Sequence, residues 1–201
     1  DTTATAATLR LALRFVMLTM VRKGEFINAT WGEVDFDSAT WTIPKERMKT
    51  GKPHVVYLST QAQDVLVTFK TCFSSSRYLH PGRYDMDTPI SNATLNRVIE
   101  VAVKAICAKG EDFESFTVHD LRRTASSLLN EAGFNRDWIE KCLAHEEGSI
   151  RGVYNKAEYA EPRRHMLQEW ANMVDAWVEG GSYAPTLLPS NTVVPFLSAT
   201  A

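Results

Sequence analysis

A change of hydrophobic period near residue 31 constrains the fold of this chain more than any other feature. Between residues 8 and 21, apolar side chains recur at three- and four-residue spacings, which predicts a helix. From residue 31 to residue 59 the pattern indicates short strands instead: two runs flank Asp37-Ser38, and a third, at 54–58, follows a turn at 49–53. Helical spacing then returns, so the order helix, small three-stranded antiparallel sheet, helices predicts a mostly helical α+β domain.

The remaining helices can be placed from capping residues and breakers. Phe26 and Ile27 belong to a short second helix, and Ser59 or Thr60 can cap the helix that follows the sheet. The last helix begins after Pro162 and stops at Gly180. The other predicted helices span residues 61–73, 91–108, 117–132, 135–144 and 149–156. Residues 1–180 therefore form one predicted domain, and 181–201 a tail that is irregular or docks on a neighbouring subunit.

Composition limits the class of protein without naming it. The 201 residues are 44% hydrophobic and 23% charged, with no apolar run long enough to span a membrane and no signal peptide at the start. Three widely spaced cysteines without zinc-ligand spacing favour a reducing cytoplasm. A net charge of −2 argues mildly against nucleic acid as a partner. DNA binding nevertheless stays open, because six basic residues gather in one segment: His119, Arg122, Arg123, Lys141, Arg151 and Lys156.

The segment from His119 to Tyr154 carries a set of residues suited to a phosphodiester. His119 and Arg122 lie three apart on a predicted helix, so they share a face and can present an imidazole and a guanidinium to one phosphate. His145 ends the next helix, and Tyr154 lies nine residues beyond it. Each residue alone is more often a surface or core residue. A phenol becomes a good nucleophile only where cations help to remove its proton, so the combination favours a site.

Two upstream residues could complete this site. Arg22 follows the first helix, and Glu25, three residues later, either pairs with its guanidinium or faces solvent. Lys49 lies in the predicted turn between the second and third strands, from which a lysine can reach into a groove as a proton donor.

Together these motifs resemble the catalytic domain of the tyrosine recombinases, the phage integrase family. The likeness rests on "VRKGE", "KTGK" before a strand, "HDLRRT", "LAH" and a tyrosine nine residues on, in this order, and covers roughly residues 6–179. The run "AHEEGSIRGVYNKAEY" before a Glu-Pro-Arg-Arg helix is similar to integrases of satellite phages and prophage islands. Ala144 stands where the family commonly has a glycine.

The resemblance implies a DNA-cleaving and rejoining enzyme without metal or cofactor. Tyr154 would attack the scissile phosphate and form a 3′-phosphotyrosyl link, while Arg22 and Arg122 hold its non-bridging oxygens. Lys49 would protonate the leaving 5′-oxygen, and His119 would act as acid or base for the tyrosine.

Further residues have supporting roles in this interpretation. His145 would hydrogen-bond the phosphate, and Glu25 would support the arginine and histidine of the site. Arg123, Lys52 and Arg151 are predicted to contact the DNA backbone.

The same resemblance implies double-stranded DNA attachment sites as partners, a homotetramer on DNA and accessory DNA-bending proteins. Three alternatives remain open from the sequence: a type IB topoisomerase that relaxes DNA, an inactive prophage remnant that binds DNA, and a helical interaction domain without a DNA role. Tyr159 is a rival nucleophile, although it lies fourteen residues past His145 and off the family spacing.

Overall fold

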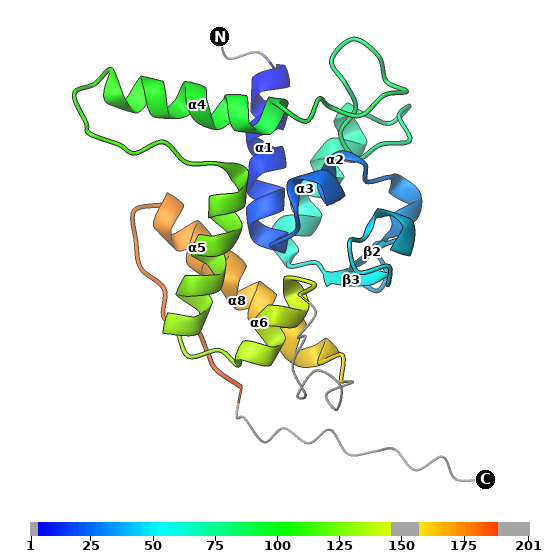
Figure 1. Ribbon diagram of the computed structural model, residues 1–201, viewed down its shortest axis with the longest axis vertical. Coiled ribbons are helices and arrows are strands. Elements are labelled where there is room, and N and C mark those ends of the chain that lie inside the picture. Colours follow the sequence, from blue (N-terminus) through cyan, green and yellow to red (C-terminus); the bar gives the residue numbers. More distant parts are fainter. Residues whose placement is uncertain (1–3, 146–156, 189–201) are drawn as a thin grey trace.

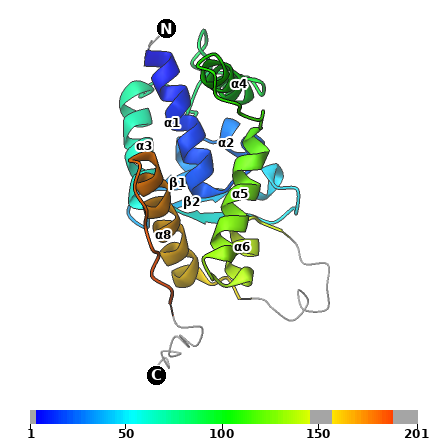
Figure 2. The ribbon, with the colours of Figure 1, turned by 90° about the vertical axis from the view of Figure 1, so that its left-hand side faces the viewer.

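A central helix organises the fold in the computed structural model, which describes residues 4–145 and 157–188 (Figures 1 and 2). The elements are α1 (Ala4–Thr19), α2 (Lys23–Ile27), η1 (Trp31–Glu33), β1 (Val34–Asp35), β2 (Thr40–Ile43), η2 (Lys45–Arg47), β3 (His54–Tyr57), α3 (Thr60–Cys72), α4 (Thr94–Cys107), α5 (Val118–Glu131), α6 (Arg136–Cys142) and α8 (Ala160–Val178). Helix α1 contacts α3, α4, α5 and α8. Because a helix surrounded by neighbours must be apolar on most faces, Ala12, Phe15 and Leu18 are buried while Leu9 and Leu13 pack at its edges.

The three strands form one antiparallel sheet in the order β1-β2-β3. In its register Thr40 pairs with Tyr57 and Ile43 with His54. Trp41 of β2 is fully buried, and its ring lies 5.7 Å from that of Phe15 on α1. The predicted α+β class and the small antiparallel sheet are therefore confirmed, with the sheet anchored to the central helix by aromatic packing.

Three helices after the sheet, α3, α5 and α6, begin at side-chain caps. Ser59 accepts a hydrogen bond from the backbone N–H of Ala62, and Asn135 accepts one from that of Asp137. Thr117 forms a capping box with Asp120 at the start of α5, where this hydrogen bonding lowers the pKa of the Asp120 carboxyl. The caps of α5 and α6 fix the starts of the two helices that carry charged residues of the site.

Several predicted helix boundaries were wrong. Helix α1 begins at Ala4, four residues earlier than expected. Helix α4 begins at Thr94, three residues later than expected, because the Ser91 carbonyl and hydroxyl accept hydrogen bonds in a turn that precedes it. Helix α8 begins at Ala160, before Pro162 rather than after it, since a proline is tolerated in the first helical turn, where its missing N–H has no partner to lose. The helix predicted over 149–156 lies outside the described residues.

The described part of the tail lies along α8. The buried carboxylate of Glu169 accepts hydrogen bonds from the Tyr183 hydroxyl and from the backbone N–H of Thr186. The Leu187 side chain lies close to Gly133, at the end of α5. Residues 182–188 are thus held in place by the same chain. The division into a domain at 1–180 and a tail at 181–201 stays a prediction.

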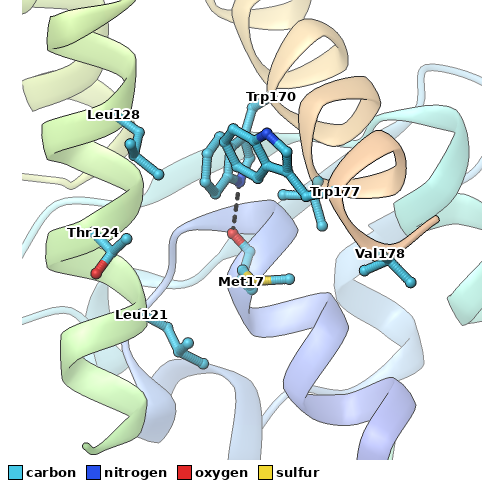
Figure 3. A pocket seen from close by; sticks show the side chains of 8 residues that line it. Met17, Leu121, Thr124, Leu128, Trp170, Trp177 and Val178 are labelled. Carbon is cyan, nitrogen blue, oxygen red and sulfur yellow. Dashed lines mark hydrogen bonds between the residues drawn. The ribbon is translucent and has the colours of Figure 1, made fainter. Parts of the chain in front are cut away.

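An apolar pocket of about 280 Å³ lies between α1, α5 and α8 (Figure 3). Met17, Leu121, Leu128 and Val174 contribute to its lining, and Trp177 at its edge is 41% exposed. Its lining is apolar except for the hydroxyl of Thr124, so it offers no charged group to a charged ligand. In the described part of the chain no helix is long and apolar enough to cross a membrane.

Candidate active site

Arg122 is one of two deeply buried charged residues that the sequence singled out, the other being Glu25. Its side chain projects from α5, only 4% of the residue is exposed, and the two terminal nitrogens donate to the carbonyls of Met20 and Leu143. Met20 itself has a left-handed backbone conformation, with φ 56°. Leu143 is followed by Ala144, which is also left-handed, with φ 46°. Such a conformation is unfavourable for residues with a Cβ atom. Two unfavourable turns therefore surround the guanidinium and direct their carbonyls at it.

Arg22 lies at the start of α2, two residues beyond the Met20 carbonyl that holds Arg122. Its backbone N–H donates to Glu25 over 2.7 Å, and its guanidinium donates to the other carboxylate oxygen over 2.8 Å. Glu25 is buried, with its backbone carbonyl held by Arg47. The predicted support of Arg22 by Glu25 is therefore a two-point contact that fixes the arginine at the helix start.

His145 follows the end of α6, which closes in a Schellman motif. The backbone N–H of His145 donates to the Glu140 carbonyl and that of Ala144 to the Lys141 carbonyl, each over 3.1 Å. The Nδ1 atom of His145 lies 2.8 Å from a carboxylate oxygen of Glu140, and Nε2 lies 3.4 Å from a terminal nitrogen of Arg122. The turn that gives Arg122 the Leu143 carbonyl thus also brings the histidine ring beside it.

The electrostatics of this cluster favour an anionic ligand. Burial, and then the positive charge of Arg22, lower the pKa of Arg122 to about 10, while Glu25 and Glu140 oppose the shift. Both of its terminal nitrogens donate to carbonyls rather than to carboxylates, so its charge is only partly compensated. An anion bound between the arginines would offset the energetic cost of burying Arg122 and of its repulsion by Arg22.

A second histidine, His54, is affected by the positive charge of the same arginines. His54, the first residue of β3, is buried, and its ring bonds the backbone carbonyl of Cys142. Burial, followed by the charges of Arg163 and Arg122, lowers the pKa of His54 to about 3. Neutral His54 therefore links the sheet to Cys142 at the end of α6. The next residue, Leu143, provides the carbonyl that accepts a hydrogen bond from Arg122.

The structure does not bring every predicted residue into this cluster. His119, in the first turn of α5, and Lys49, between β2 and β3, have exposed side chains, and no hydrogen bond joins either to the described arginines of the site. Arg123 is exposed and pairs with Asp120, and Lys52 is exposed near Lys49. Tyr154 and Arg151 lie outside the described residues.

Sequence reasoning missed two contributors, Glu140 and His54. Glu140 precedes His145 by five residues, a spacing that a Schellman motif brings together, so it could have been inferred from the helix end. His54 had no local signal, because its role depends on how the sheet packs against α6. Among residues 4–145 and 157–188, no group of three or more His, Cys, Asp or Glu residues could hold a metal ion.

Comparison with known proteins identifies the family of this chain. The family model described as "Phage integrase family" matches residues 1–161. The chain belongs to the phage integrase family. It is 38% identical over 174 residues to the prophage integrase IntZ of Escherichia coli K12, a match that covers 86% of this chain and 41% of the relative. The chain therefore spans less than half the length of that integrase.

Solved structures agree on the fold. The catalytic core of lambda integrase has a TM-score of 0.54 at 21% identity, covering 72% of this chain and 83% of that one. The Tn1549 transposon integrase, solved in complex with circular intermediate DNA, has a TM-score of 0.59 at 14% identity and covers 82% of this chain and 59% of that one. At these identities the likeness shows an integrase fold, and the chemistry must be argued from the residues of this chain.

Proposed function

We propose that this chain is the catalytic domain of a site-specific DNA recombinase that cleaves and rejoins DNA through a covalent 3′-phosphotyrosyl link at Tyr154. The observation that carries the proposal is the meeting of Arg22, Arg122 and His145, which come from three separate elements. Guanidinium and imidazole groups are suited to donate hydrogen bonds to the non-bridging oxygens of a phosphodiester. The integrase relatives and the DNA-bound transposon integrase support DNA as the substrate.

The reaction then needs no metal ion or external energy. The phenol oxygen of Tyr154 forms a bond to phosphorus as the bond to the 5′-oxygen breaks, and the arginines stabilise the charge that develops on the phosphate. His119 takes the phenol proton and Lys49 gives one to the leaving 5′-oxygen, which departs as a hydroxyl. The exposed side chains of His119 and Lys49 are free to approach a bound duplex. Attack by a 5′-hydroxyl of another strand reverses these steps and releases the tyrosine.

An ion pair supports the assignment of Tyr154 as the nucleophile. Lys141 on α6 binds the carboxylate of Glu158 over 3.1 Å, and Arg163 donates to the Glu158 carbonyl over 3.2 Å. Residue 158 is therefore held beside the helix whose end carries His145. Tyr154 belongs to the short stretch of sequence that links His145 to Glu158.

The remaining partners follow from the same proposal. Arg123, Lys52 and Arg151 would contact the DNA backbone and add affinity without sequence specificity. Strand exchange between two duplexes calls for four active sites, so the complete protein would act as a homotetramer on its attachment sites, with accessory DNA-bending proteins.

The test is covalent trapping on a nicked suicide substrate that carries the cognate attachment site. The wild type is expected to form a protein–DNA adduct that Tyr154→Phe abolishes and Tyr159→Phe, the matched control, retains. An adduct that survives in Tyr154→Phe and disappears in Tyr159→Phe would overturn the assignment. Relaxation of supercoiled plasmid without any strand exchange would favour the type IB topoisomerase alternative, and no adduct from any variant would favour an inactive DNA-binding remnant.

The role of Lys49 has its own chemical test. A substrate with sulfur in place of the bridging 5′-oxygen has a leaving group that departs without protonation. Lys49→Ala is expected to be slow on the ordinary substrate and close to wild type on the sulfur substrate. Equal losses on both substrates would refute Lys49 as the general acid.

A further inference from the structure

Glu140 holds His145 at two points. Its backbone carbonyl accepts the backbone N–H of His145 over 3.1 Å, and its carboxylate lies 2.8 Å from the Nδ1 atom of the ring. The Glu140 side chain is 23% exposed and that of His145 is 48% exposed, so the pair lies at the rim of the charged cluster. One residue therefore fixes both the backbone position and the ring orientation of the histidine.

The two neighbours of the ring select the same tautomer. A carboxylate can only accept, so Nδ1 must carry the proton of their hydrogen bond. A guanidinium can only donate, so Nε2, which lies 3.4 Å from Arg122, must present a lone pair in the neutral ring. Both contacts are satisfied at once only when the neutral ring is protonated on Nδ1. The Nε2 lone pair then lies beside the guanidinium, where the phosphate is proposed to bind, and Nε2 must gain a proton before it can donate to a phosphate oxygen.

The carboxylate also balances charge. Glu140 raises the pKa of Arg122 through its negative charge, as Glu25 does, so the cluster of Arg22, Arg122 and His145 contains two carboxylates on different elements. When the ring is an imidazolium, Nε2–H can donate to a phosphate oxygen while Glu140 retains its bond to Nδ1–H. The Glu140 carboxylate then offsets the positive charge of the imidazolium, which would otherwise be opposed only by repulsion from Arg122.

We propose that Glu140 is a positioning residue for His145, which sets the ring tautomer and keeps Nε2 directed at the bound phosphodiester. The inference rests on the proposed recombinase function for its catalytic consequence, but the tautomer is a property of the DNA-free protein. The two parts can therefore be tested separately.

The first test is nuclear magnetic resonance of the ¹⁵N-labelled chain at about pH 8.5, roughly two units above the reference histidine pKa. Long-range ¹H–¹⁵N spectra distinguish the two tautomers, and loss of a signal in His145→Asn assigns the ring. The wild type is expected to be protonated on Nδ1. Glu140→Gln should keep that tautomer because its amide oxygen still accepts, whereas Glu140→Ala should lose it. A wild-type ring protonated on Nε2, or an unchanged tautomer in Glu140→Ala, would overturn the proposal.

The second test follows the rate of covalent adduct formation and the affinity for the nicked duplex. Loss of a residue that orients a reacting group typically costs ten- to a hundredfold in activity, so Glu140→Ala is expected to slow adduct formation by about tenfold or more. The dissociation constant should change by less than about twofold, because one phosphate contact among many is affected. Glu140→Gln should recover most of the rate, and Glu131→Ala, an exposed glutamate at the end of α5, serves as the control.

The outcomes separate the two proposals. Normal adduct formation by a folded Glu140→Ala protein would refute the positioning role while leaving the recombinase function intact. If even the wild type forms no adduct, the proposed function fails, and the tautomer measurement still decides whether Glu140 positions the ring.

Discussion

Replacing Ala144 by glycine isolates the conformational cost of the turn that holds Arg122 and His145. Ala144 has φ 46°, in the left-handed region, at the position of the Schellman motif where glycine is usual. A residue with a Cβ atom in this region is destabilised by about 1–2 kcal/mol. Glycine removes that cost but adds unfolded-state entropy of about 0.4–1 kcal/mol. Ala144→Gly is therefore expected to raise the free energy of unfolding by roughly 0.5–1 kcal/mol, or about 1–4 °C in Tm for a chain of this size.

Ala132→Gly is the matched control. Ala132 is also half-buried and follows the end of a helix, α5, but its φ is −70°, where alanine is unstrained. It should be destabilised by roughly 0.5–1 kcal/mol through entropy alone. Urea unfolding of both variants gives the left-handed cost as their difference, about 1–2 kcal/mol. Equal destabilisation of the two proteins would refute the reasoning, because Ala144 would then bear no conformational penalty.

Three further predictions concern charge. Because the pKa of His54 is lowered to about 3 in the folded state, its contribution to stability is present above pH 6.5 and is lost as pH falls from 6.5 towards 3. Between pH 7 and pH 5 the wild type should therefore lose ~2 kcal/mol more than His54→Gln in urea unfolding, and parallel losses would contradict this. Arg122→Lys is expected to lower the rate of adduct formation by about a hundredfold or more, since one ammonium nitrogen does not reproduce the planar fork whose separate nitrogens bond the carbonyls of Met20 and Leu143 and face the phosphate; a loss of under about fivefold in single-turnover assays would count against it. With a net charge of −2, DNA binding by this chain alone should be weak and fall steeply with salt, and a flat plot of log K against log salt would exclude phosphate contacts as its source.

Much of the architecture follows from local patterns in the sequence. The alternation around Trp41 predicted the sheet, because side-chain direction in a strand has a period of two whatever the surroundings. Thr117 and Gly133 marked the ends of α5, since caps act within a single turn. The start of α8 was predicted after Pro162, whereas the helix begins at Ala160 with Pro162 in its first turn. The prediction failed because the proline rule does not separate the first turn of a helix from the residues before it.

Some properties of the site follow from local sequence, and others depend on tertiary packing. By itself the sequence determined which chemical groups are present. The spacings of His119, Arg122, His145 and Tyr154 were enough to indicate phosphate chemistry, because spacing within a helix or turn is a local property. Only the tertiary structure decided that Arg122 is buried, that the carbonyls of Met20 and Leu143 hold it, and that Glu140 orients His145 beside it. Burial, desolvation and contacts across more than a hundred residues depend on how the elements pack. A linear pattern carries no record of that packing.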